Sequence, residues 1–596
     1  MTIGECHPSN AGSVVPRSPR LPLAAFAAAL VLGRTAGAGA FPLLDASSPD
    51  QVPQGTELST PDVHDLQHQL QLVNGLTAPL GGGWTIIPRI DWQEELTDNV
   101  QQLNSPRQSD LVTYISPGIG IAGDLPRLQL TFDFAPTLSI YTRTGDLNSL
   151  TEQMNGLGTV TLVPDLAYVD VRAVAGVHNQ YGGLGGLGAL GVPAGSAATP
   201  QSAIPVLAGN TLGLNKSNEV QTTSFGVSPY LLRRFGEWGT GKLGYSVDAT
   251  KSNTLSGFAA SPFPSGGDNA QTLISQEEIA HFQTGEFMEY LQDAFDIDLQ
   301  QTQTTSGAGV IDFRTGLPLQ SEQNSSSTRA LVTDQITYQV NRVVAVFASG
   351  GHEDITYTGI GAQSIHDLTW SLGTTLTPNV DSSLTVSYGH LNGDTSLSAD
   401  GHYALTARTM LTLSYGTSLG TQLQYVQNQL NLATAGSNGT LVNGQTGGGL
   451  FGATNALGVE DGVFRTTTLT VGSQTTLDRD IISVTFQSAK QTNTGTNVNA
   501  SSNETKSAGV SWLHQMRPDM TASAAISYAV QDQSNGFVSA FNPGNNTSIA
   551  MTLAWQWQIS DTVSTSVRYS FFERQSAVTI YDMYQNMLIL GISKRF

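Results

Sequence analysis

The chain has 596 residues, of which 12% are charged and 39% are apolar, and it contains 63 glycines. A soluble protein usually carries about twice this share of charged residues. Sparse charge with moderate apolarity suits a wall that has one face in lipid and the other in water. The net charge of −21 also argues against a nucleic-acid partner, because such binding needs a basic surface.

The first 40 residues have the pattern of a secretory signal peptide. Arg17 and Arg20 precede an apolar run over 21–33, and small residues follow as far as Ala38-Gly39-Ala40. We predict cleavage after this A-x-A site, which is formed by Ala38 and Ala40. The alternative is a transmembrane anchor, but the run has only 13 residues and is too short to span a bilayer.

Removal of residues 1–40 changes the chemistry expected of the mature chain. The only cysteine, Cys6, is lost, which excludes disulfides, thiol catalysis and Cys-based metal sites. Three of the 26 basic residues and one of the 47 acidic residues are lost as well, which leaves 23 against 46 and a net charge of −23. No later stretch approaches the roughly 18 apolar residues of a membrane helix. Periodicity must therefore separate a soluble protein from a β-barrel.

Residues 41–83 are rich in Pro, Gly and Gln, and one short helix is expected over 63–73. We predict a flexible periplasmic arm or plug, with a disordered linker as the alternative. His64 and His68 lie four residues apart, a spacing that can share a metal ion. No third ligand accompanies them, so we predict polar surface positions and no metal site.

From Trp84 onward, apolar and polar residues alternate along the chain. Over 127–140 the even positions are mostly apolar, whereas the odd positions include Arg127, Gln129 and Asp133. Successive strand side chains point to opposite faces, so each such segment has an apolar face and a polar face. A soluble sandwich also alternates but rarely sustains about twenty strands. We therefore predict an all-β fold, a transmembrane outer-membrane barrel of about 16–20 antiparallel strands over 84–596.

The connections are expected to differ at the two ends of this barrel. Short turns such as Gly123-Asp124 and Gly236-Glu237 suit the periplasmic end. Among the strands, a single one is expected near residue 165. Long polar outer loops are predicted at 177–218, 252–285, 428–462 and 533–546. Interfacial aromatic girdles are predicted from Trp84, Trp92, Trp370, Trp512 and Tyr584.

Two sets of residues are candidates for a role in the barrel itself. The alternation places four charged or amide side chains in the lumen, namely Arg127, Gln129, Asp133 and Arg568. The last strand is amphipathic and ends in an aromatic residue, with one face formed by Leu588, Leu590, Ile592 and Phe596. Such an ending is similar to the signal that barrel proteins present to the outer-membrane assembly machinery.

Two motifs have the form of catalytic or cofactor sites. Gly416–Gly420 matches G-x-S-x-G, but its flanks alternate as strands, so we predict a hairpin turn rather than a nucleophile elbow. Gly183–Gly188 matches G-x-G-x-x-G without a following helix, which favours an outer loop over a dinucleotide site. We predict no enzymatic activity, no catalytic residues, no cofactor and no metal. A barrel hydrolase remains the last of the alternatives.

The first part of the barrel resembles a known family. The segments that carry the resemblance are Trp84–Ile90, Glu95–Val100, Ser109–Val112, Ile115–Gly118 and the terminal Lys594-Arg595-Phe596. They resemble the porin-like outer-membrane β-barrel family associated with exopolysaccharide and PEP-CTERM loci. The resemblance implies a barrel in the bacterial outer membrane that forms an exit duct for polysaccharide, and it supplies no catalytic residues. Its motif positions are Asp98, Asn99, Pro117 and Gly118, of which the first two are expected to form a turn.

Export of an exopolysaccharide is therefore the first functional hypothesis. The net charge of the mature chain would repel a polyanion, so a neutral polymer is the easier passenger. The alternatives are a general diffusion porin for small solutes and a plugged barrel whose loops bind partners. The expected partners are outer-membrane lipid, the barrel-assembly machinery and a polysaccharide. The passenger and the oligomeric state are left open.

Overall fold

The computed structural model describes residues 83–179, 219–254, 271–306, 311–312, 317–318, 324–359, 362–431, 433–435, 441–443, 463–494, 502–534, 545–577, 579 and 582–596. The signal peptide with Ala38 and Ala40, the arm at 41–82 and the Gly183–Gly188 motif lie outside the described residues.

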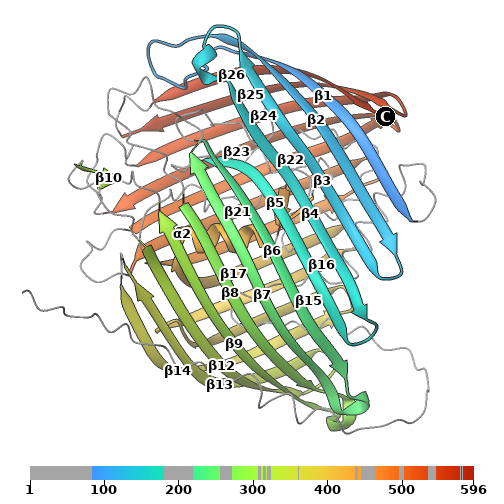
Figure 1. Ribbon diagram of the computed structural model, residues 1–596, viewed down its shortest axis with the longest axis vertical. Coiled ribbons are helices and arrows are strands. Elements are labelled where there is room, and N and C mark those ends of the chain that lie inside the picture. The colour runs from blue at the N-terminus through green and yellow to red at the C-terminus, as the bar shows by residue number, and fades with distance from the viewer. Residues whose placement is uncertain are drawn as a thin grey trace, which may run out of the picture. The chain divides into compact units, whose positions relative to one another are not determined.

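One sheet of 22 strands forms the described part of the protein. Each strand pairs antiparallel with the next one along the sheet, and β1 also pairs with β26, so the sheet closes into a barrel. Figure 1 shows the blue-to-green strands running diagonally in front of the orange-to-red strands of the C-terminal part. The all-β barrel predicted from alternation is confirmed. Its strands are β1 (Trp84–Thr97), β2 (Asp110–Leu125), β3 (Leu128–Tyr141), β4 (Ser149–Val163), β5 (Ala167–Asn179), β6 (Glu219–Arg234), β7 (Gly239–Thr254), β8 (Gln271–Thr284), β9 (Leu291–Ser306), β12 (Asn324–Gln339), β13 (Val344–Thr358), β14 (Gln363–Asn379), β15 (Ser382–Leu391), β16 (Asp394–Thr406), β17 (Thr409–Thr421), β20 (Val463–Thr476), β21 (Asp480–Asn493), β22 (Ser502–Arg517), β23 (Met520–Ser534), β24 (Asn546–Ser560), β25 (Val563–Ser576) and β26 (Met583–Arg595).

Few other elements accompany the barrel. Two short hairpins lie in the connections, formed by β10 (Ile311–Asp312) with β11 (Leu317–Pro318) and by β18 (Ala433–Ala435) with β19 (Leu441–Asn443). Three 3₁₀ turns are η2 (Gly145–Leu147), η5 (Gly236–Trp238) and η6 (Glu286–Met288), and the described α-helix is α2 (Gln422–Asn431). Among the described residues, no helix is long and apolar enough to cross a membrane.

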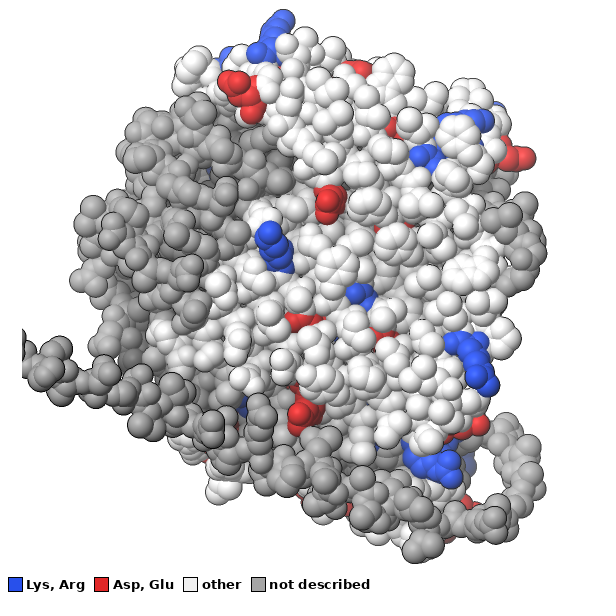
Figure 2. Space-filling view, viewed as in Figure 1, with Lys and Arg blue, Asp and Glu red and all other residues white. Residues whose placement is uncertain are grey.

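The two faces of the wall follow the alternation of the sequence. On β1 the inward side chains are buried and polar, and they include Thr85, Arg89, Asp91, Gln93 and Glu95. The outward side chains are exposed and apolar, and they include Ile86, Ile90, Trp92 and Leu96. Figure 2 shows a described surface that is mostly uncharged, with isolated acidic and basic side chains. This is the arrangement of a barrel with lipid outside and polar groups inside.

The aromatic residues proposed for the interfacial girdles are mostly exposed. Trp92, Trp370, Trp512 and Tyr584 are all exposed large hydrophobic residues. Trp84 is half-buried, and its ring lies so close to Gly123 that a Cβ there would come within 2.9 Å of it.

The two ends of the barrel carry different connections. Short links such as 126–127, 164–166 and 380–381 lie at one end, together with the start of β1 and the end of β26. The strand ends that flank residues 180–218 and 444–462 lie at the other end, and they include Asn179, Glu219 and Val463. By the rule for outer-membrane barrels, the short-turn end is periplasmic and the long-loop end faces outward.

The strand count of 22 exceeds the expected number for two reasons. The segment expected to be one strand near residue 165 is the pair β4 and β5, joined by a link at 164–166. The predicted loop 252–285 is wrong over 271–284, which forms β8. The outward face of β8 includes Gln276 and Glu278, so its alternation is weak in the sequence. The turn placed at Gly123-Asp124 lies three residues later, at Pro126-Arg127, because β2 continues to Leu125.

The family-motif residues Asp98 and Asn99 close the seam between the first and last strands. The carboxylate of Asp98 accepts hydrogen bonds from Asn586 N (2.8 Å) and Asn586 Nδ2 (2.7 Å). Asn99 is fully buried, and its Nδ2 donates to the carbonyls of Leu103 (2.8 Å) and Tyr584 (2.9 Å). These residues therefore stabilise the loop after β1 and also bind β26 at the outward end.

Candidate functional site in the barrel lumen

Pairs of hydroxyl groups join neighbouring strands on the inner wall. Ser224 and Thr250 lie 2.9 Å apart, and Thr302 and Ser327 lie 2.6 Å apart. The same arrangement occurs at Ser349–Ser371, Thr375–Thr385 and Ser387–Ser398. A hydroxyl both donates and accepts, so each pair can still bond a further partner. Much of the inner wall is therefore an uncharged hydrogen-bonding surface.

A first ion-pair group on the inner wall involves the predicted lumen residue Asp133. Arg89 on β1 makes a two-pronged contact with this carboxylate, with Nη2 donating to Asp133 Oδ1 at 2.7 Å and Nη1 donating to Oδ2. Arg89 Nε also donates to Asp91 at 3.2 Å. The arginine reaches β3 by lying across Gly118 on β2, where a Cβ would come within 2.8 Å of Arg89 Nε. The motif glycine thus makes room for the ion pair, and its neighbour Pro117 pairs with Ile90.

A second ion pair has the same construction elsewhere in the wall. Arg172 on β5 and Asp248 on β7 are both buried, and Arg172 Nη2 lies 3.2 Å from Asp248 Oδ1. Gly226 on β6 stands between them in register with both. A Cβ at Gly226 would come within 2.1 Å of Asp248 Oδ1. In both groups a glycine on the middle strand lets an arginine reach an acid across it, so Asp133 and Asp248 are each paired with an arginine.

The other predicted lumen residues occupy different places. Arg568 is buried on β25. It pairs in register with Ile589 on β26, which in turn pairs with Glu95 on β1. Gln129 pairs in register with Thr159, whose hydroxyl donates to Asp170 at 2.7 Å. Arg127 is exposed in the short turn between β2 and β3.

The tip of the β15–β16 hairpin is held inside the barrel. Its two turn residues, Asn392 and Gly393, have positive φ angles of 57° and 70°, which suit a two-residue hairpin turn. Their backbone N–H groups donate to the two carboxylate oxygens of Glu353, at 2.9 and 2.8 Å. Glu353 is fully buried on β13, on the inward face that also carries Ile355. The hairpin tip therefore leaves the line of the wall and binds an inward carboxylate two strands away.

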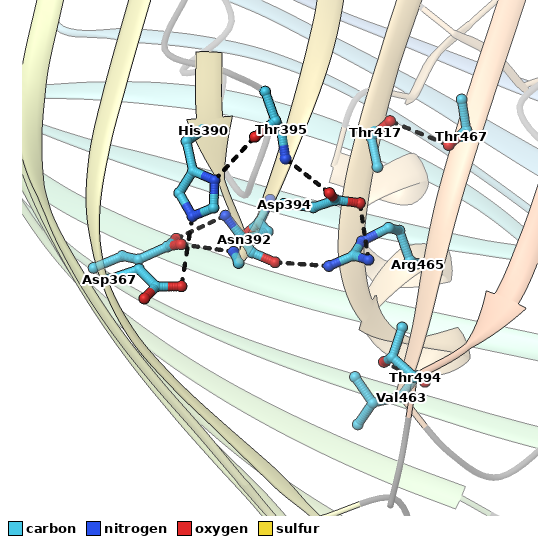
Figure 3. Close-up of polar contacts among 12 residues, drawn as sticks. Asp367, His390, Asn392, Asp394, Thr395, Thr417, Val463, Arg465, Thr467 and Thr494 are labelled. Atoms are coloured by element: carbon cyan, nitrogen blue, oxygen red, sulfur yellow. Dashed lines mark hydrogen bonds and ion pairs between the residues drawn. The ribbon is translucent and has the colours of Figure 1, made fainter.

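Arg465 on β20 holds the other side of this tip (Figure 3). Its Nη2 donates to the carbonyl of Asn392 at 3.0 Å, and its Nη1 lies 3.0 Å from Asp394 Oδ2. The tip is thus fixed between β13 and β20 by charged side chains on both sides.

Helix α2 also lies inside the barrel, and a capping box begins it. The hydroxyl of Thr421 accepts a hydrogen bond from Gln424 N at 3.2 Å, and Gln424 Oε1 accepts one from Thr421 N at 2.8 Å. The Nε2 of Gln424 donates to Thr302 Oγ1 (2.9 Å) and to Ser327 Oγ (3.0 Å) on β9 and β12. Five strands, β12 to β16, separate β17 from β9 around the sheet. The helix that follows β17 therefore reaches, inside the barrel, a part of the wall that lies beyond these five strands. Figure 1 shows α2 among the strands of the barrel.

A pocket lies between α2, the hairpin tip and the wall. Its wall residues are Gln300, Arg329, Ile355, Tyr357, Thr466 and Gln491, and Asn392 contributes from the hairpin tip. The segment from Ser418 to Thr421 and the helix residues Gln424, Tyr425 and Asn428 complete the lining.

One group beside this tip has a composition that suits a metal ion. Glu353, Asp367 and His390 each offer a ligand atom, and these atoms lie within 4.8 Å of one another. Both oxygens of Glu353 already accept the turn N–H groups, and His390 is bound to Thr395 and Asp367 (Figure 3). These bonds give the three residues a structural role in holding the hairpin. His64 and His68 lie outside the described residues.

The G-x-S-x-G segment does not form the predicted hairpin turn, which is therefore wrong. Gly416–Gly420 lies within β17, paired with β20, and α2 follows directly. The Thr421-x-x-Gln424 capping box was the signal for this helix, and strand periodicity obscured it. Ser418 is extended strand rather than a strained turn, and among the described residues no hydrogen bond joins it to a histidine.

The comparisons with known proteins concern structure only, since no protein-family model and no curated protein matches the sequence. The FrpB iron transporter from Neisseria meningitidis is similar with a TM-score of 0.49 and 10% identity, covering 89% of this chain and 83% of that one. The ferric-catecholate import receptor Fiu from E. coli K12 has a TM-score of 0.47 and 8% identity, with 85% and 81% covered. BauA, the ferric preacinetobactin receptor from Acinetobacter baumannii, has a TM-score of 0.45 and 12% identity, with 85% and 80% covered.

The closed sheet, the apolar outer face and the polar inner face together define the class of protein. A sheet without free edges satisfies its backbone hydrogen bonds in lipid, which an open sheet cannot do. The chain is an outer-membrane β-barrel of a bacterial cell.

Proposed function

We propose that this barrel is a transport channel for a neutral, hydroxyl-rich polymer, and that exopolysaccharide export is its function. The observation that carries the proposal is the inner wall, which carries pairs of serine and threonine hydroxyls between neighbouring strands and two groups of acids paired with arginine. A polymer of sugar hydroxyls finds donors and acceptors along such a wall. A polyanion would instead meet the strongly negative charge of the chain.

The size of the barrel is compatible with this role. Barrels of about 16–18 strands already enclose an aqueous channel, and larger ones have room for elements inside the lumen. In this barrel α2 and the β15–β16 tip occupy part of that room. We infer that these two elements narrow the passage to the dimensions of an extended chain.

Deletion of the gene tests export directly. We expect secreted polysaccharide to disappear in the deletion strain and to return on complementation, while the biosynthetic genes are still expressed. Unchanged secretion would remove exopolysaccharide export and leave a general diffusion porin or a closed barrel.

The second candidate is a closed barrel that binds partners through its outer loops, because α2 and the hairpin tip are fixed inside the lumen. Gln424→Ala separates the two. It removes the capping bond and both bonds to the far wall, which destabilises the inward position of α2 by about 1–3 kcal/mol. In a channel, single-channel conductance in planar bilayers should rise in this variant.

The matched control for that variant is Gln301→Ala, since Gln301 is exposed next to Thr302 on the opposite face of β9. Its conductance should equal that of the wild type. If neither the wild type nor Gln424→Ala conducts ions, the closed barrel is the better account.

A further inference from the structure

The pocket beneath α2 contains an arginine whose hydrogen-bonding capacity is not used. Arg329 Nε and Nη2 are buried and have no hydrogen-bond partner. Burial of a guanidinium N–H without a partner is costly, because the group has given up water and gained nothing in return. The arginine lines the pocket, so a molecule bound there lies beside a guanidinium with two unpartnered nitrogens.

The surroundings of Arg329 decide what charge this molecule carries. In the register of the sheet, Arg329 pairs with Gln300 on β9, and Gln300 pairs with Glu277 on β8. Glu277 and Asp298 both interact electrostatically with Arg329. The positive charge of Arg329 thus already faces two acidic side chains of the wall. A neutral ligand with acceptor oxygens suits the site better than an anion, which would also face these two carboxyl groups.

The remaining lining narrows the chemical class further. The side chains of Gln300, Gln424, Asn428 and Gln491 are amides, which can both donate and accept hydrogen bonds. Tyr357, Leu419 and Ile355 provide an apolar face in the same pocket. A sugar ring presents the same combination, with hydroxyl groups at its edge and C–H groups on its faces.

We propose that the pocket beneath α2 is a binding site for one neutral sugar unit, with the Arg329 guanidinium donating to its oxygens. The site rests on the proposed function, since it would hold a unit of the exported chain at the narrow part of the lumen. It adds a defined subsite and a class of ligand, a neutral saccharide rather than a uronic acid.

The test is calorimetric titration of the purified full-length barrel with neutral hexasaccharides of glucose, galactose and mannose, and with a hexamer of glucuronic acid. At least one neutral hexamer should bind. The informative variant is Arg329→Lys, which keeps the charge that balances Glu277 and Asp298 but loses the planar fork of donors. We expect the Kd of the neutral hexamer to rise about tenfold, the effect of losing one good hydrogen-bonded contact.

The control variant is Arg408→Lys, since Arg408 is an exposed residue of a short turn far from the pocket lining. It should leave the Kd unchanged, and heat-modifiable migration on gels should show both variants folded. Three results would overturn the site: no neutral hexamer binds, Arg329→Lys binds as tightly as the wild type, or the acidic hexamer binds more tightly than the neutral ones. If the barrel binds a neutral hexamer but deletion of its gene leaves secretion unchanged and the barrel does not conduct ions, the proposed channel is refuted and the sugar site stands. If the barrel conducts ions but binds no neutral hexamer, the sugar site is refuted and the channel stands.

Discussion

Two glycines in the wall of this barrel leave the space that the charged side chains of an ion pair need in order to meet across a strand. Gly118 and Gly226 each lie on a middle strand, and an arginine side chain from one neighbouring strand lies over each of them. With any larger residue the arginine could not reach the acid beyond. The two ion pairs therefore depend on residues that carry no chemistry of their own.

This dependence gives a residue-scale prediction for Gly226→Ala. The added Cβ would stand 2.1 Å from Asp248 Oδ1, so the carboxylate must move away from Arg172. Separating a buried ion pair leaves both charges uncompensated, and we expect a loss of about 2–4 kcal/mol in the free energy of unfolding. Urea unfolding in lipid vesicles, followed by tryptophan fluorescence, measures it.

The matched control is Gly350→Ala, because a Cβ at Gly350 meets nothing within 4 Å. Equal stability of the two alanine variants would show that the Arg172–Asp248 pair does not stabilise the wall.

Such contacts are beyond what the sequence can predict. Alternation assigns Asp133 to the polar face, and the structure places it there, bound to Arg89. The partner itself follows from the register of three strands, and no local pattern reports that register. Arg329 and its pocket were missed for the same reason, since the lining comes from β9, β12, β13, β17, β20 and β21.

At the scale of elements, one hairpin of the described residues turns into the barrel. The β15–β16 tip turns inward and ends in two residues with positive φ, of which Gly393 has a φ of 70°. It is tied to Glu353 and Arg465 rather than exposed at the rim. Its position depends on turn geometry as well as on the ion pair.

Gly393→Ala tests that geometry. A Cβ at a positive φ is strained, and here it would also come within 3.1 Å of Ile365 Cδ1. We expect a loss of about 1–2 kcal/mol and faster hydrogen exchange of the backbone N–H groups bound to Glu353. Gly416→Ala is the comparison, since nothing lies within 4 Å of its Cβ. If the exchange of those N–H groups is unchanged, the tip is not held by this turn.

Elements were predictable where most of their outward face is apolar. β3 and β26 are of this kind, and the alternation predicted both. The prediction missed β8 because Gln276 and Glu278 interrupt its apolar outward face. It merged β4 and β5 into one strand because the link between them has only the residues 164–166. Helix α2 was not predicted, because its first turn directly follows β17 and the sequence there shows no break in the strand alternation.

For the whole molecule, the pairing of β1 with β26 is decisive, because it closes the sheet into a barrel. The seam between β1 and β26 joins residues almost 500 positions apart, and Asn99 links to Tyr584 across it. The terminal strand carries Leu588, Leu590 and Ile592 on its exposed face, and the backbone N–H of Phe596 donates to the carbonyl of Pro88 at 2.9 Å. The role of these residues as an assembly signal stays a prediction.

Asn99→Ala should weaken the seam. The change removes three hydrogen bonds of the buried Asn99 side chain, which join it to the Leu103 N–H and to the carbonyls of Leu103 and Tyr584, and this costs about 1–3 kcal/mol. We expect a lower Tm in the heat-modifiable gel assay. Asn104→Ala is the control, because Asn104 is exposed and makes one bond to the carbonyl of Thr579. A Tm equal to that of the control would mean that the seam does not limit stability.

The inward hairpin tip also has a consequence for the chemical lifetime of the protein. Asn-Gly is the dipeptide in which an asparagine most easily loses its side-chain amide as ammonia, because the next backbone nitrogen attacks the side-chain carbonyl carbon and glycine does not hinder it. In this barrel that nitrogen belongs to Gly393, and its hydrogen is held by Glu353 at 2.8 Å. Asn392 is itself buried beneath the rim. The bond that positions the tip therefore also protects Asn392 against deamidation in the folded barrel.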